Sequence, residues 1–153
     1  MSKNASTGHA SNFLFLVDHN KEMAALTVES ARQYREWDLY TECGGIEVAR
    51  TETRMDELRR RMDSSKNWGI ESRLVTPAEI KELVPYIDES ILVGGFYTPE
   101  VGVCDSLRFG TICREKAQGL GALSVFANTE VSGFGIEGGR IRSVETSRGT
   151  IEA

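Results

Sequence analysis

The sequence predicts a mixed α/β fold, with helices packed on a mixed sheet and a β-meander near the end of the chain. Three observations predict it. Several stretches repeat apolar residues at helical spacing, shorter stretches between them alternate as strands do, and the last part holds only strand-like stretches separated by turn residues. With 153 residues, 40% of them hydrophobic, the chain is long enough for one domain with a buried core.

The first half of the chain predicts two amphipathic helices around a strand. Between about residues 20 and 38 the apolar residues recur at helical spacing, on a face formed by Met23, Leu26, Ala31, Tyr34 and Trp37. Residues 46–50, "IEVAR", alternate as a half-buried strand does. A second helix is expected from Thr51 to about residue 67, where the helical pattern ends.

A capping motif marks the third helix. In "TPAE", Thr76 is expected as the N-cap, Pro77 as the first helical residue and Glu79 as the residue that closes a capping box. This short helix should stop near Pro85. The stretch "ILVGGFY", residues 91–97, predicts a strand whose two glycines indicate either a bulge or the close approach of another backbone.

Asp105 is expected to cap a fourth helix that ends between Gly119 and Gly121. The strand-like stretches that follow are residues 123–127, 130–136, 139–146 and 150–153. A formal G-x-G-x-x-G lies at Gly133, Gly135 and Gly138, but no helical pattern follows it. A dinucleotide fingerprint must open a helix, so this motif instead predicts a hairpin turn.

Composition excludes several classes of function. The net charge of −5 argues against nucleic acid as a partner, and no apolar run is long enough for a membrane span. The N-terminus does not have the pattern of a secretion signal, and three cysteines without a C-x-x-C pair favour reduced thiols. We therefore expect a cytoplasmic protein.

Two histidines are the remaining candidates for chemistry. Neither His9 nor His19 has a ligand partner at metal spacing, and no G-x-S-x-G elbow supports a Ser-His-Asp hydrolase. A lone histidine near a terminus is most often structural or exposed to solvent, and His19 at a helix start is most simply a capping or surface residue. A metal site is therefore not expected.

Five stretches in order resemble the dimethylglycine and sarcosine dehydrogenase (oxidase) group of FAD-dependent oxidoreductases, within the D-amino-acid-oxidase-like superfamily. They are "ASTGHASNFLF", "GGIEVARTETRMDELRRRM", "TPAEIKELVPYID", "GGFYTPEVGVCDSLRF" and "CREKAQGLGALSVFANTEVSGF". The sequence departs from the group's pattern at Glu100 and Val101, where x-D usually precedes the glycine, and at Ser106, where proline commonly follows the aspartate. These departures weaken any inference about a particular substrate.

The resemblance implies FAD as cofactor, bound covalently through His9, since the corresponding histidine often carries the flavin. Ser6, Thr7, Gly8 and Ala10 would lie against the flavin or bond to it, and the backbone of Val131 would meet the adenine. The family reaction oxidises an N-methyl amine such as sarcosine or dimethylglycine by hydride transfer to flavin N5. The catalytic residues are not identified, and many relatives carry a C-terminal folate-binding domain.

The resemblance also implies how the chain is organised. Residues 40–104 would form the substrate-side sheet and helices of a two-domain oxidoreductase, and residues 1–39 and 105–153 would form part of its FAD-binding domain. The family's glycine-rich unit is not among these residues, so we expect a central fragment that is inactive alone. Apolar surface normally covered by that unit would then favour oligomers. The alternative is a non-catalytic relative or stand-alone module that binds a protein partner.

Overall fold

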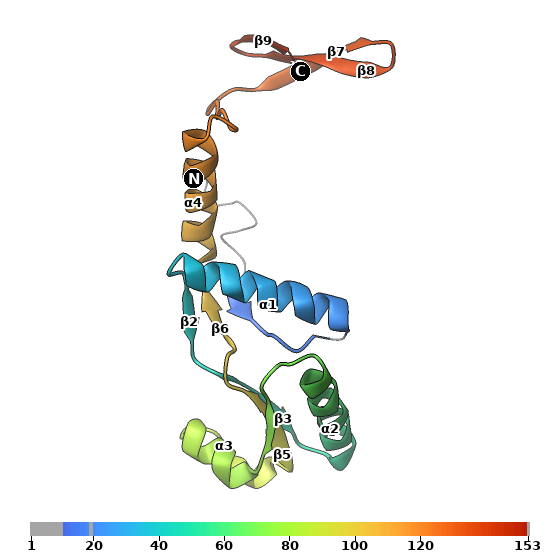
Figure 1. Cartoon of the computed structure of the whole chain (residues 1–153), viewed down its shortest axis with the longest axis vertical. Coiled ribbons are helices and arrows are strands. Elements are labelled where there is room, and N and C mark those ends of the chain that lie inside the picture. Colours follow the sequence, from blue (N-terminus) through green and yellow to red (C-terminus); the bar gives the residue numbers. More distant parts are fainter. Residues whose placement is uncertain (1–10, 19, 153) are drawn as a thin grey trace. The chain divides into compact units, whose positions relative to one another are not determined.

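The computed structural model describes residues 11–18 and 20–152. Contacts between residues divide the chain into two compact units, residues 1–112 and residues 113–153. The helices shown in Figure 1 are α1 (Lys21–Glu36), α2 (Glu52–Asn67), α3 (Pro77–Leu83) and α4 (Ser106–Gly119), with a short 3-10 helix at Glu89–Ile91. This mixture of helices and antiparallel sheets confirms the predicted mixed α/β class.

The first unit contains two small antiparallel sheets. One has the order β1 (Phe13–Leu14), β6 (Gly102–Cys104) and β2 (Tyr40–Glu42). The other has the order β3 (Gly45–Ala49), β5 (Gly94–Thr98) and β4 (Arg73–Val75). The strands predicted at residues 46–50 and 91–97 therefore correspond to β3 and β5, which pair in the same sheet.

Helices α2 and α3 lie on opposite sides of the β3–β5 pair (Figure 1). The glycines of β5 explain how closely both helices approach. A Cβ on Gly94 would lie 3.1 Å from Sδ of Met55 in α2, and one on Gly95 would lie 3.0 Å from Cδ1 of Ile80 in α3. A Cβ on Gly95 would also lie 2.9 Å from the Glu47 carbonyl oxygen. The predicted close approach of another backbone is confirmed.

A single hydrophobic cluster forms the core of the first unit. Its buried members come from the segment after β1, from α1, β3, α2, the segment between α2 and β4, β5 and the loop before β6. They are Leu16, Val17, Ala24, Ala31, Ala49, Met55, Leu58, Ile70, Phe96 and Val101. The apolar face predicted for α1 is only partly right: Ala31 is buried, but Met23 and Leu26 are exposed and Ala24 is buried instead.

The predicted helix caps are confirmed. Thr76 and Glu79 form the capping box, with the Glu79 amide donating to the Thr76 hydroxyl over 3.3 Å and the Thr76 amide donating to the Glu79 carboxylate over 2.8 Å. The Asp105 carboxylate accepts from the Arg108 amide over 2.9 Å at the start of α4. In the same helix, the Phe109 ring stacks on Trp37 at 5.2 Å between centroids.

The second unit is the predicted β-meander, with the order β7 (Val131–Glu137), β8 (Arg140–Thr146) and β9 (Gly149–Glu152). Gly138 and Gly139, with φ of 58° and 75°, make the turn between β7 and β8, as the hairpin interpretation requires. The strand predicted at residues 123–127 is wrong, because this stretch forms no strand in the structure. Its composition favours extended backbone, but no described strand pairs with it.

Candidate functional site

The residues predicted to contact the cofactor fall in two parts of the chain. Ser6, Thr7, Gly8, His9 and Ala10 lie outside the described residues, as does His19. Val131 is described, and it begins β7 in the second unit, opposite Thr146 and with 52% of its surface exposed. Their roles therefore remain predictions.

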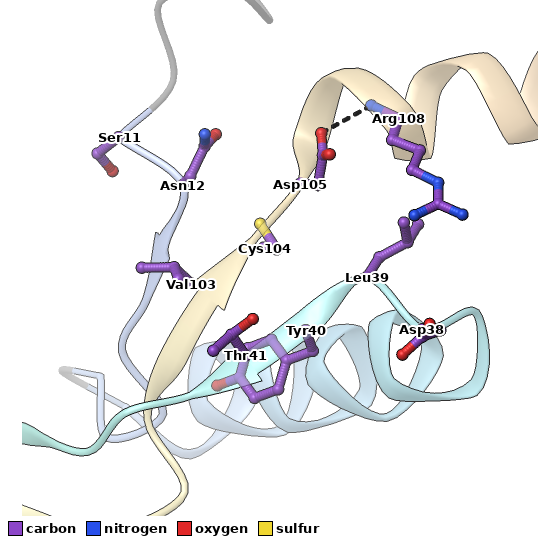
Figure 2. Close-up of a pocket in the computed structure, with 10 residues that line it drawn as sticks. All are labelled: Ser11, Asn12, Asp38, Leu39, Tyr40, Thr41, Val103, Cys104, Asp105 and Arg108. Atoms are coloured by element: carbon purple, nitrogen blue, oxygen red, sulfur yellow. Dashed lines mark hydrogen bonds between the residues drawn. The ribbon is translucent and has the colours of Figure 1, made fainter.

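A polar cavity of about 580 Å³ lies beside Ser11 and Asn12, the first described residues (Figure 2). Three separate segments build its walls: the start of the described chain, the turn from α1 into β2, and the end of β6 with the first turn of α4. The residues that line it are Ser11, Asn12, Asp38, Leu39, Tyr40, Thr41, Val103, Cys104, Asp105 and Arg108.

Backbone hydrogen bonds fix these three segments relative to one another. The Cys104 amide donates to the Asn12 carbonyl over 2.8 Å, and the Asp105 amide donates to the Leu39 carbonyl over 3.0 Å. The Ser106 hydroxyl donates to Oδ1 of Asn12 over 2.6 Å. The cavity wall is therefore a bonded part of the first unit, since each segment is tied to the β6–α4 connection.

Two lining residues adopt the left-handed backbone conformation, Asn12 with φ of 61° and Asp38 with φ of 55°. Asparagine and aspartate tolerate this conformation better than other residues with a Cβ, but it still has a free-energy cost. Asp38 takes this conformation just after the end of α1, because its amide donates to the Arg35 carbonyl over 3.0 Å and the Leu39 amide donates to the Tyr34 carbonyl over 2.8 Å.

Tyr40 supplies a hydroxyl that stays protonated at neutral pH. Burial raises its pKa from the ordinary value of 10.0 to about 12, although the Arg35 guanidinium opposes the shift. The hydroxyl donates to the Glu100 carbonyl over 2.8 Å. The remaining polar lining combines the carboxylates of Asp38 and Asp105 with the guanidinium of Arg108, so the cavity can bind a polar molecule through groups of both charges.

The described residues do not form a complete site for FAD. The pyrophosphate of a dinucleotide needs a glycine turn between a strand and a helix. Gly133 and Gly135 instead lie in β7, and Gly138 lies in the β7–β8 turn. The polar cavity in the first unit could hold at most a part of such a cofactor.

Residues 11–18 and 20–152 contain neither a candidate membrane-spanning helix nor a candidate metal site. No helix there is both long and apolar enough to cross a membrane. In the same part of the chain, no three His, Cys, Asp or Glu side chains gather where they could hold a metal ion.

Comparison with known proteins identifies the class and then the family. The fold matches L-proline dehydrogenase from P. horikoshii with a TM-score of 0.84 and 25% identity, over 97% of this chain and 41% of that one. Residues 2–153 match the DAO family of FAD-dependent oxidoreductases. The chain belongs to this family, as the resemblance predicts.

Two curated relatives are similar over most of the chain. Mitochondrial sarcosine dehydrogenase of Homo sapiens is 34% identical over 116 residues, which are 71% of this chain and 12% of that protein. The mitochondrial pyruvate dehydrogenase phosphatase regulatory subunit of Mus musculus is 31% identical over 113 residues, 74% of this chain and 13% of that protein. The chain thus spans about an eighth of the length of these relatives.

The sequence patterns identified Asp105 in this site only as a helix cap, and they missed Asn12, Asp38, Tyr40 and Arg108. The available signal was weak. Asp38 ends the first predicted helix, and both Asn12 and Asp38 are residue types that adopt the left-handed conformation.

Proposed function

We propose that this chain acts as part of an FAD-dependent oxidoreductase that oxidises an N-methyl amine of the sarcosine or dimethylglycine type. The observation that carries the proposal is the 34% identity to human sarcosine dehydrogenase over 71% of the chain. FAD, when bound by the whole protein, supplies the acceptor for the hydride equivalent that leaves the methyl carbon.

In this proposal the chain's own residues hold and orient the cofactor. His9 is the covalent attachment point, because a neutral imidazole is a suitable nucleophile near pH 7. Ser6, Thr7, Gly8 and Ala10 contact the flavin, and the backbone of Val131 contacts the adenine. The polar cavity that begins at Ser11 supports this assignment, since it continues from the same stretch of sequence.

The same proposal divides the chain by role. Residues 40–104 contribute to the substrate side, and residues 1–39 and 105–153 contribute to the FAD-binding part. The glycine-rich unit and the catalytic residues come from other parts of the protein. A folate-binding domain that receives the one-carbon unit belongs to the same hypothesis.

The experiment starts from the natural reading frame. DNA on both sides of the coding sequence is determined, and the whole uninterrupted frame is expressed and purified. The protein is precipitated with acid, and flavin is measured in the pellet and in the supernatant. Sarcosine, dimethylglycine and L-proline are then tested for reduction of an artificial electron acceptor. We expect flavin in the pellet and reduction with the N-methyl amines.

Two matched variants test the attachment point. His9→Ala should move the flavin from the acid pellet to the supernatant, whereas His19→Ala, which removes the other histidine of this chain, should leave it in the pellet. Pellet flavin that survives in His9→Ala would exclude His9 as the tether. Flavin with no amine-dependent reduction would exclude the proposed substrate class.

A second candidate is a non-catalytic role in binding a protein partner. It is favoured by the 31% identity to the pyruvate dehydrogenase phosphatase regulatory subunit, whose name is that of a regulatory protein. A whole protein that folds cooperatively but carries flavin in neither fraction would support this role and overturn the first proposal.

A further inference from the structure

Strand β3 forms one edge of its sheet, and among the described residues no strand pairs with that edge. The sheet order is β3, β5 and β4, and β3 pairs with β5 alone. The Ala49 carbonyl faces β5, because it accepts from the amide of Val93, the residue before β5, over 2.8 Å. Backbone groups alternate in direction along a strand, so Ile46 and Val48 direct their amides and carbonyls to the free edge. Such a row of groups is a template for a further strand.

The side chains of the same two residues line a cavity on the α3 side of the sheet. This cavity has a volume of about 550 Å³, and Ile46 and Val48 share its lining with Ile80, Leu83 and Tyr97. Ile80 is fully buried, but Leu83 is 46% exposed, and Ile46 and Val48 are only partly buried. No charged side chain is among the described residues that line the cavity. The cavity therefore suits apolar side chains and disfavours charged ones.

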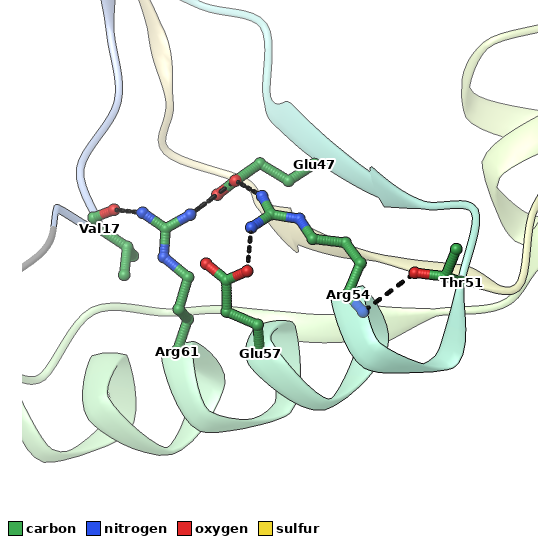
Figure 3. Close-up of polar contacts among 6 residues, drawn as sticks. All are labelled: Val17, Glu47, Thr51, Arg54, Glu57 and Arg61. Carbon is green, nitrogen blue, oxygen red and sulfur yellow. Dashed lines mark hydrogen bonds and ion pairs between the residues drawn. The ribbon is translucent and has the colours of Figure 1, made fainter.

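The opposite face of β3 is already covered. Glu47 points toward α2, where its carboxylate accepts from Arg54 and from Arg61, over 2.6 Å in each case (Figure 3). Ala49 lies on the same face and is fully buried. The uncovered apolar surface of β3 is therefore on its α3 side, next to its free edge.

The relatives that match this chain have much more chain than the part that corresponds to it. The chain covers 41% of the L-proline dehydrogenase structure and 12% of human sarcosine dehydrogenase. A strand from the same protein is tethered near the β3 edge, so its effective concentration there is far above that of a second copy. This difference favours an occupant from the same protein.

We propose that a strand from the same protein, outside residues 1–153, pairs with the free edge of β3 and extends this sheet. Alternate side chains of that strand lie beside Ile46 and Val48 and close the cavity at α3, so they are apolar and uncharged. The β3 edge is then where the substrate side, assigned above to residues 40–104, continues into the rest of the protein. The inference rests on the proposed function only in treating these residues as part of a longer protein.

Hydrogen exchange of the whole protein, expressed from the uninterrupted reading frame, tests the pairing without a substitution. The Glu47 amide faces β5 and is the control within the same strand. We expect the Ile46 and Val48 amides to exchange within about tenfold of the Glu47 rate, because all three amides are then bonded. Faster exchange of Ile46 and Val48 than this would show a free edge and overturn the inference.

Photo-cross-linking of the whole protein identifies the occupant. Val48→benzoylphenylalanine places a photoreactive group at the edge, and mass spectrometry identifies the captured peptide. We expect capture of a segment outside residues 1–153 at the mass of a single chain. The control, Val28→benzoylphenylalanine on α1, starts from a valine that is 40% exposed and should not capture that segment.

Three results of this second experiment would overturn the inference. Capture at the mass of a dimer would assign the edge to a second copy. Capture only within residues 1–153 would assign it to a part of this chain, and a reading frame that holds only these residues leaves no further strand. If the Val48 variant does not fold, the exchange of the unchanged protein decides the question.

The outcomes are distinguishable from a failure of the proposed function. Slow exchange and capture of an outside segment in a protein without flavin would overturn the proposed function and leave the interface standing. Flavin and amine oxidation in a protein whose Ile46 and Val48 amides exchange fast would overturn only the interface.

Discussion

The two units of the chain treat their large apolar side chains in opposite ways. In the first unit Phe96 of β5 is fully buried in the core cluster that includes Met55 and Leu58 of α2, whereas in the second unit Phe134 is 56% exposed. None of the described residues between 113 and 152 is buried. Both units nevertheless contain antiparallel ladders, although the β7–β8 ladder has two register shifts. The presence of strand pairing therefore does not explain the difference in burial.

Large apolar residues of the meander lie opposite one another, and all of them except the partly buried Val144 are exposed. Phe134 is opposite Val144, Val144 is opposite Ile151, and Ile136 is opposite Ile141. Residues directly opposite each other share a face of the sheet. An apolar face stabilises a sheet to the extent that it is removed from water, and this face is mostly exposed. Turns and strand pairing therefore set the local structure of the second unit, whereas burial of apolar side chains supplies the stability of the first.

The largest expected change in the free energy of unfolding comes from replacing one phenylalanine in each unit by alanine. Phe96→Ala should lower the free energy of unfolding by about 3–5 kcal/mol, because it removes a buried ring and leaves a cavity. Phe134→Ala should change it by less than about 0.5 kcal/mol, because the ring is mostly in water already. Both changes in the free energy of unfolding are measured in a urea series, in which hydrogen exchange of the β5 and β8 amides reports on each unit. Equal losses would contradict the comparison.

The apolar face of the meander, on which Phe134 and Ile151 are exposed, is available to a second copy of the chain. We expect the 153-residue chain to self-associate through it, seen in sedimentation as an average mass that rises with concentration. Phe134→Lys should reduce this association. Thr150→Lys adds the same charge beside Ile151 but on the other face, opposite Glu145, and should leave the association in place. A wild-type chain that stays monomeric throughout the series would refute the prediction.

Features set by neighbouring residues were predictable from the sequence. The Thr76 capping box, the Asp105 cap and the Gly138–Gly139 turn each depend on contacts within about four residues, and the structure contains all three. The stretch at residues 123–127 has the same kind of local signal but forms no strand, because a strand also needs a partner that the local pattern does not specify.

Features that depend on distant partners were missed. Strands β2, β4 and β6 have three residues each, too few for a recognisable alternation, and they exist because of strands far along the chain. The candidate cavity has the same origin, since Asn12 meets Cys104 and Leu39 meets Asp105. The bond from Arg61 to Val17 spans 44 residues, and no local pattern predicts it.

The smallest expected effect is a pH dependence of stability, which follows from the burial of the Tyr40 hydroxyl in the first unit. The pKa of Tyr40 is raised to about 12, so folding favours the protonated hydroxyl. Its contribution to stability is therefore complete below about pH 10 and is lost as the pH rises from 10 to 12. Tyr40→Phe cannot ionise, and its free energy of unfolding should fall less steeply across that range.

Two measurements check this last effect. Urea midpoints between pH 9 and 12 compare the slopes of wild type and Tyr40→Phe, and absorbance at alkaline pH follows tyrosinate formation directly. Tyr40→Phe should lose the tyrosine that ionises near pH 12. At neutral pH it should also lose about 1 kcal/mol with the bond to the Glu100 carbonyl. The contrary result is that the tyrosine ionisation absent from Tyr40→Phe occurs near pH 10 in the wild type. Water would then reach the Tyr40 hydroxyl freely, and the cavity wall at Tyr40 would resemble the exposed second unit more than the buried first one.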